Sequence, residues 1–269
     1  MRKIIASLLL IFLCIFIIGS PVYASEPTVH ASAAILLDAK TGEILYAKNA
    51  YVPRAPASTT KIMTALLAIE RGQLDDIVTV STKAAAVGEA SLHLSPGDKL
   101  TMRDLLHGAL LKSGNDACVA LAEAICSSEE EFVNLMNLKA RVLGAENTSF
   151  YNTNGLPHKD HLTTAYDLAL MARYAMSNKD FAEIVGKKEY TIQWLEPKRI
   201  LKIKNTNQLL HSYEWITGVK TGTTNKAGKC LVASGSYQGR EMIVVILNSG
   251  DRFGEAKRLL EYGLRGEGA

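Results

Sequence analysis

The chain has 269 residues, of which 48% are hydrophobic and 21% charged, and its formal net charge is +3. These values are ordinary for a globular protein of one large domain, and they exclude a disordered, collagen-like or low-complexity chain. The charge is too small to indicate a nucleic-acid-binding protein, so no nucleic acid is expected as a partner.

The first 24 residues have the pattern of a secretory signal peptide. A basic start at Arg2 and Lys3 precedes an apolar run over residues 4–18, and small residues follow as far as Ala24. This order predicts export across the cytoplasmic membrane, to the cell wall or periplasm, with cleavage after Ala24. The alternative is a retained membrane anchor, but the run is shorter than the roughly 20 apolar residues of a typical span.

The first half of the mature chain begins with a hairpin and continues into helices. Residues 33–37 and 43–47 are predicted as two strands joined by a turn at 38–42. Thr101 and Asp104 resemble a capping box at the start of a helix. Helices are predicted over residues 58–71, 102–111, 116–125, 130–143 and 164–176.

Near Tyr190 the apolar period changes from that of helices to that of strands. Strands are predicted over residues 190–195, 200–203, 215–220, 229–237 and 241–247, followed by a helix over 255–264. The order predicts an α+β fold, in which both chain ends build an antiparallel sheet and a helical lobe is inserted between them. An odd number of cysteines in the mature chain argues against a disulfide framework, and no Cys or His spacing predicts a metal site.

The string Ser58-Thr59-Thr60-Lys61 is the first of three candidate motifs. Three residues are nearly one helical turn, so Ser58 and Lys61 share a face. At a helix start the Ser58 N–H is free to donate to an oxyanion, and burial of Lys61 would lower its pKa. Lys61 could then accept the proton of the Ser58 hydroxyl. The alternative is an N-cap serine beside a lysine that extends to solvent.

The second motif is Ser113-Gly114-Asn115, between two predicted helices. Gly114 permits a tight turn there. Ser113 could relay a proton, and Asn115 could hold a substrate carbonyl or orient Lys61. The alternative is a helix end followed by an N-cap asparagine.

The third motif, Lys220-Thr221-Gly222, ends a predicted strand. Lys220 and Gly222 would face one side, where Lys220 supplies positive charge for an anionic substrate end. Gly222 leaves room for an extended peptide along the strand. The alternative is an ordinary strand-to-turn sequence. Because Lys40-Thr41-Gly42 repeats the tripeptide in a predicted hairpin turn, only the three motifs in order carry the interpretation.

In this order the motifs resemble those of the penicillin-recognising serine enzymes. The second motif reads Ser-Gly-Asn, where class A β-lactamases usually have Ser-Asp-Asn. Residues 55–64, 154–156, 161–169 and 217–222 are similar to stretches of the low-molecular-mass D-alanyl-D-alanine carboxypeptidases, and the likeness covers essentially the whole mature chain. It implies removal of the last D-Ala from peptidoglycan stem peptides, covalent inhibition by β-lactams, and no cofactor.

The resemblance also implies a role for each matching residue. Ser58 would form the acyl-enzyme with Lys61 as its general base, and the N–H of Thr223 would join that of Ser58 in an oxyanion hole. The implied catalytic residues are Ser58, Lys61 and Ser113, and the implied substrate-binding residues are Asn115, Lys220, Thr221, Gly222, Thr223 and Arg252. Lys220, Thr221 and Arg252 would lie near the substrate carboxylate.

Larger family members continue into a second β-rich domain and a C-terminal amphipathic anchor, whereas this sequence ends at Ala269. We therefore expect residues 25–269 to form the catalytic domain alone, without a stable membrane anchor after signal cleavage. Two alternative functions remain open. A class A-like β-lactamase would need a Glu-x-x-Leu-Asn segment that this sequence lacks. A β-lactam-sensing or peptidoglycan-binding module would be acylated without useful turnover.

Overall fold

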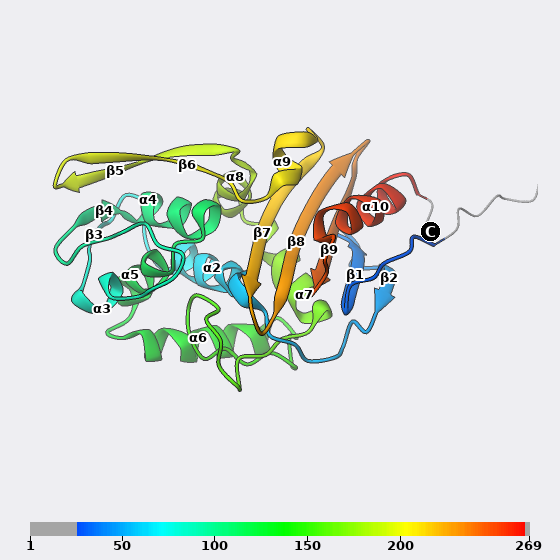
Figure 1. The fold of residues 1–269 in the computed structure, drawn as a ribbon, viewed down its shortest axis with the longest axis horizontal. Coiled ribbons are helices and arrows are strands. Elements are labelled where there is room, and N and C mark those ends of the chain that lie inside the picture. The colour runs from blue at the N-terminus through cyan, green and yellow to red at the C-terminus, as the bar shows by residue number, and fades with distance from the viewer. Residues whose placement is uncertain (1–25, 267–269) are drawn as a thin grey trace, which may run out of the picture.

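Two antiparallel sheets and a set of helices make up residues 26–266, the part of the chain that the computed structural model describes (Figure 1). The predicted signal peptide, residues 1–24, lies outside the described residues. No helix between residues 26 and 266 has the length and apolar character needed to cross a membrane.

The larger sheet joins the two ends of the described chain. Its strand order is β2-β1-β9-β8-β7, and every neighbouring pair is antiparallel. The strands are β1 (Ala33–Asp38), β2 (Ile44–Lys48), β7 (Ile216–Thr224), β8 (Gly228–Tyr237) and β9 (Arg240–Leu247). The predicted sheet of both chain ends is thereby confirmed. The tripeptide at residues 40–42 lies in and beside the turn between β1 and β2, as predicted.

Both faces of this sheet are covered, which explains why the central stretches of its inner strands are mostly apolar. Along β1, Ile35 and Leu37 pack in the core shared with the helical lobe, whereas Leu36 packs in a second core with helix α10 (Arg252–Leu264). Figure 1 shows α10 in front of β8 and β9, and α7 (Ala165–Met176) behind the sheet. A strand buried on both faces needs apolar side chains at every position.

A second sheet on the helical lobe was not predicted. The predicted strands 190–195 and 200–203 form β5 (Glu189–Glu196) and β6 (Arg199–Lys204), but they do not join the larger sheet. They pair instead with β3 (Ile77–Thr79) and β4 (Lys99–Thr101), in the order β3-β4-β5-β6. Strands of three residues are too short for alternation to be visible in a sequence.

Every helix predicted between residues 58 and 176 is present in the helical lobe. Its helices are α2 (Lys61–Arg71), α3 (Thr82–Ala85), α4 (Met102–His107), α5 (Asn115–Ile125), α6 (Glu129–Val142), α7, α8 (Lys179–Gly186) and, beside the larger sheet, α9 (Gln208–Ser212). The short helices α3, α8 and α9 were not predicted. The Thr101 hydroxyl accepts a hydrogen bond from the Asp104 N–H, which confirms the predicted cap.

Three predicted helices differ in their first or last turn. The helix predicted over 58–71 starts with a 3₁₀ turn, η1 (Ala57–Thr60), before α2. The helix predicted over 102–111 ends in a π-helical turn, η2 (Gly108–Lys112). The closing helix begins at Arg252 rather than at 255, because the Asp251 carboxylate accepts a hydrogen bond from the Gly254 N–H and caps it there.

Candidate active site

Ser58 lies in the 3₁₀ turn η1, which runs directly into α2. The preceding Ala57 has a left-handed backbone, with φ of 50°. The hydroxyl of Thr59 donates to the Pro56 carbonyl at 2.7 Å, and that of Thr60 donates to the Ala57 carbonyl at 2.9 Å. These local bonds hold the turn, so the partly exposed Ser58 hydroxyl has a defined position at the end of a buried helix.

Lys61 is fully buried, and its ammonium group faces three oxygen atoms. Its Nζ donates to Ser58 Oγ at 3.0 Å, to Asn115 Oδ1 at 2.7 Å and to the Asn154 carbonyl at 2.6 Å. Burial lowers the pKa of Lys61 to about 8, because removal from water disfavours the charged form. A neutral amine could keep the two shorter bonds and turn its lone pair toward the Ser58 hydroxyl.

The second motif lies beside the first. Ser113 follows η2 in a left-handed conformation, with φ of 70°, and Asn115 begins α5. Asn115 Oδ1 accepts from Lys61, so Asn115 orients the lysine, one of the two roles left open by the sequence. Ser113 Oγ accepts a hydrogen bond from Lys220 Nζ at 3.1 Å, which connects the second motif to the third.

The third motif lies inside β7 rather than at its end, because the strand continues to Thr224. Lys220 is buried, and its pKa is lowered well below the usual value, first by burial and then by the nearby charge of Lys61. A Cβ atom on Gly222 would lie only 2.8 Å from the Ser58 nitrogen. The backbone of β7 therefore packs directly against the turn that carries Ser58, and only glycine fits there.

Arg252 joins this end of β7 from the first residue of α10. Its Nη1 donates to the Gly222 carbonyl at 2.8 Å and to Thr223 Oγ1 at 2.9 Å. The hydroxyl of Thr221 is hydrogen-bonded to that of Thr206 at 2.7 Å. The structure thus brings all nine predicted site residues to one region, where Lys220 and Arg252 are basic groups in addition to Lys61.

Two neighbours of Lys61 had no predicted role. The carbonyl of Asn154 accepts from Lys61, and the next residue, Gly155, has a φ of 90°. A Cβ atom on Gly155 would lie 1.9 Å from the Ala57 carbonyl oxygen, so the segment touches the backbone next to Ser58. The Asn-Gly pair is a recognisable turn signal. Every residue has a backbone carbonyl, so the hydrogen bond from Lys61 to the Asn154 carbonyl could not be predicted from the residue type.

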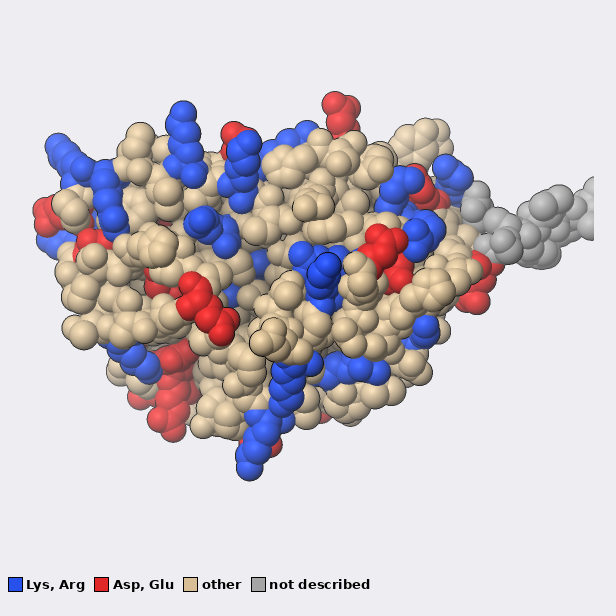
Figure 2. Space-filling model, viewed as in Figure 1, with Lys and Arg blue, Asp and Glu red and all other residues tan. Residues whose placement is uncertain are grey.

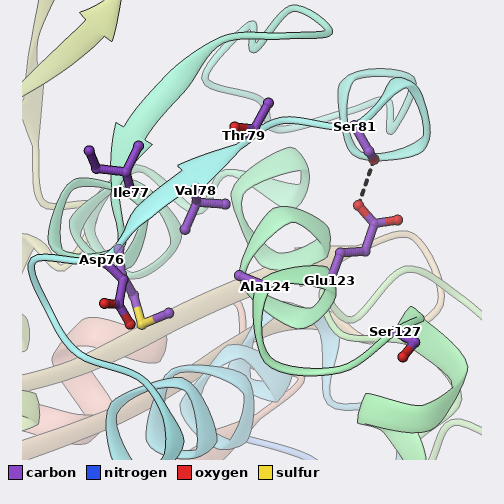
Figure 3. A pocket seen from close by; sticks show the side chains of 9 residues that line it. Asp76, Ile77, Val78, Thr79, Ser81, Glu123, Ala124 and Ser127 are labelled. Carbon is purple, nitrogen blue, oxygen red and sulfur yellow. Dashed lines mark hydrogen bonds between the residues drawn. The ribbon is translucent and has the colours of Figure 1, made fainter.

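Figure 2 shows basic atoms inside a hollow in the middle of one face, next to the position of β7. A separate cavity of about 630 Å³ lies between β3, α3 and the end of α5 (Figure 3). There the Ser81 hydroxyl donates to a carboxylate oxygen of Glu123 at 2.5 Å. None of the nine site residues lines this cavity. Between residues 26 and 266, no cluster of three or more His, Cys, Asp or Glu side chains is placed to hold a metal ion.

Known proteins resemble this chain in both sequence and fold. The family model described as D-alanyl-D-alanine carboxypeptidase matches residues 20–251. The chain is 39% identical over 246 residues to the D-alanyl-D-alanine carboxypeptidase DacF of Bacillus subtilis (strain 168), which covers 88% of this chain and 63% of that protein. It is 36% identical to DacC of Escherichia coli (strain K12), with coverage of 93% and 66%. It therefore spans about two thirds of the length of these relatives.

A solved structure gives the same result for the fold. The crystal structure of the Streptomyces K15 DD-transpeptidase superposes with a TM-score of 0.86 at 34% identity, covering 90% of this chain and 100% of that one. The motifs converge in one region, the match to the family model extends through all three of them, and the fold agrees with that of a solved relative. The chain belongs to the D-alanyl-D-alanine carboxypeptidase family.

Proposed function

We propose that the protein is a serine-type carboxypeptidase that removes the terminal D-Ala from peptidoglycan stem peptides ending in D-Ala-D-Ala. The observation that carries this proposal is the chain of contacts from Ser58 Oγ to Lys61 Nζ, and from Lys220 Nζ to Ser113 Oγ, with Asn115 beside Lys61. Acyl transfer requires a nucleophile with a base within hydrogen-bond reach, as Ser58 has in Lys61, and a second hydroxyl on the motif beside that base, which Ser113 supplies.

Acylation would begin when the neutral Lys61 amine accepts the proton of the Ser58 hydroxyl. The Ser58 oxygen then attacks the carbonyl carbon between the two D-Ala residues, and the carbonyl oxygen becomes an oxyanion. The N–H groups of Ser58 and Thr223 are proposed to donate to that oxygen. Asn115 and the Asn154 carbonyl hold Lys61 in place during this transfer, because both accept hydrogen bonds from its Nζ.

Collapse of the intermediate would break the peptide bond and release D-Ala. Its amine needs a proton, which Lys61 holds after the first step and which Ser113 can relay, since its hydroxyl both donates and accepts. The acyl group then remains on Ser58 as an ester. Water attacks this ester while Lys61 accepts one of its protons. The bond between the acyl carbon and Ser58 Oγ then breaks, Lys61 returns the proton to Ser58 Oγ, and the shortened stem peptide leaves with a new terminal carboxyl group.

The substrate's terminal carboxylate is proposed to bind along β7. Lys220, Thr221 and Thr223 supply a cation and hydroxyl groups there, with Gly222 leaving space for an extended chain. Arg252 adds a second cation, because its guanidinium contacts both the Gly222 carbonyl and the Thr223 hydroxyl. Binding an anion between two such cations is electrostatically favourable.

The decisive experiment combines product release with location of the adduct. Purified protein is expected to release D-Ala from a peptide ending in D-Ala-D-Ala, and mass spectrometry is expected to find a penicilloyl group on Ser58. Ser58→Ala should abolish both while remaining folded by circular dichroism, whereas Ser177→Ala, at the end of α7, should retain both. Labelling of the Ser58→Ala protein would refute the assignment. Stoichiometric labelling without D-Ala release would favour a binding module.

The similarity to a protein named DD-transpeptidase supports a second candidate, in which an amine rather than water takes the acyl group from Ser58. Adding glycylglycine to the D-Ala release assay tests this: a new peptide product would support transpeptidation. Fast catalytic loss of penicillin in the same preparation would instead favour a β-lactamase.

We also propose that the chain is exported, that it is cleaved after Ala24, and that residues 25–269 contain the catalytic domain. The basic and apolar N-terminal pattern supports export. The intact mass of the protein recovered outside the cytoplasm tests the proposal. A mass that lacks the first 24 residues is expected, and a mass that includes them would contradict cleavage.

A further inference from the structure

The loop between α3 and β4, residues 86–98, forms a wall next to Lys61 because it is hydrogen-bonded to Asn115. The Asn115 N–H donates to the Ala90 carbonyl at 2.7 Å, and Asn115 Nδ2 donates to the Gly88 carbonyl at 3.0 Å. The residues on both sides of Glu89 are thus bound to the same asparagine whose Oδ1 accepts from Lys61. Glu89 is therefore carried at a fixed place beside the proposed catalytic lysine.

The same loop has a second attachment at Asp116. This fully buried carboxylate accepts from the Ser91 hydroxyl at 2.6 Å, from the Leu92 N–H at 2.9 Å and from the Leu94 N–H at 3.1 Å. Hydrogen bonds to a buried carboxylate are among the stronger ones in proteins. The loop is consequently a preorganised part of the site.

The Glu89 carboxylate is exposed and has no partner among residues 26–266, where it makes no hydrogen bond and no ion pair. The backbone of Glu89 is left-handed, with φ of 65°. Its neighbours Gly88 and Ala90 are bound by Asn115, which also binds Lys61, so the carboxylate is carried next to the proposed catalytic groups. Burial lowers the pKa of Lys61, and the negative charge of Glu89 opposes that shift.

The other charged groups near the cleft limit where a peptide can run. Lys220 and Arg252 form the cationic end along β7, which the proposed function assigns to the terminal carboxylate. The rest of the peptide must leave Ser58 on a side that this end does not occupy, and the wall carried by Asn115 borders Lys61, which contacts Ser58. Asp116 is already saturated by the loop and Lys112 is exposed and basic, so Glu89 is the acidic group available on this wall.

We propose that Glu89 is a specificity residue that binds a cationic side chain on the residue preceding the D-Ala-D-Ala end. Free stem peptides with an amine at that residue would be preferred over stems in which the amine is acylated, as in a cross-link, because an amide carries no charge. This inference rests on the proposed carboxypeptidase function and assigns its substrate preference.

The test compares two peptides that differ only in one charge, Nα-acetyl-Lys-D-Ala-D-Ala and its Nε-acetylated form. For the wild-type protein, kcat/KM for D-Ala release should be about two- to five-fold higher with the free amine, the range for an exposed ion pair. The preference should shrink in 1 M NaCl, where the screening length falls to about 3 Å.

The variant Glu89→Gln should bring the ratio of the two kcat/KM values to about one, and Glu89→Lys should reverse it. Glu241→Gln, with the same charge change at the opposite end of the larger sheet, should retain the preference. Equal rates for both peptides with wild type, or a preference that survives Glu89→Gln, would overturn the inference and leave the carboxypeptidase function standing. Absence of D-Ala release from either peptide would overturn both.

Discussion

The buried amine of Lys61 should govern how acylation depends on pH. Its pKa is lowered from 10.5 to about 8, so the neutral, proton-accepting form increases as pH rises. For a pKa of about 8, the neutral fraction is about 1% at pH 6, about 9% at pH 7 and about 50% at pH 8. The acylation rate should therefore rise nearly tenfold from pH 6 to pH 7 and level off above pH 8.

The assay is the rate constant for penicilloyl-enzyme formation, followed by intact-protein mass spectrometry at limiting β-lactam concentration between pH 5.5 and 9.5. Lys220 adds a second effect, because its pKa is also lowered and its loss of charge weakens carboxylate binding. The profile should therefore decline on the alkaline side. As a control, Lys112→Gln removes an exposed neighbouring charge and should leave the acid limb in place. A rate that is constant between pH 6 and pH 8 would refute the assignment of Lys61 as base.

Three substitutions test the packing around the nucleophile. Gly222→Ala puts a Cβ 2.8 Å from the Ser58 nitrogen, so the acylation rate should fall at least tenfold, and the free energy of unfolding measured in urea should fall by about 1–3 kcal/mol. The control Gly250→Ala, which has open space around the new Cβ, should change neither quantity. Gly155→Ala meets a backbone oxygen at 1.9 Å with φ of 90°, and should lower the urea midpoint further than Gly222→Ala does. Asp116→Ala leaves two buried N–H groups of the loop unpaired, at about 1–3 kcal/mol each, and should speed hydrogen exchange there; unchanged exchange would contradict that role.

Secondary structure in this chain was predictable where segments were long and periodic. Helices α5, α6 and α7 and strands β8 and β9 lie within two residues of their predicted bounds, because each repeats its apolar spacing over eight or more residues. The second sheet was missed because β3 and β4 have three residues each. The sheet that β5 and β6 join depends on the positions of β3 and β4, and the local sequence of residues 189–204 does not encode those positions.

The contact between Ser58 and Lys61 was visible in their spacing alone, because any helical turn, 3₁₀ or α, brings side chains three residues apart to one side. The places of Asn154 and Arg252 were decided only by tertiary packing. Asn154 is 93 residues from the lysine that it binds, and Arg252 is 30 residues from the Gly222 carbonyl. Contacts over such separations depend on how the lobe closes against β7. The sequence therefore predicted the pairing of Ser58 with Lys61, while the fold determined which groups hold Lys61 and which cations lie beside it.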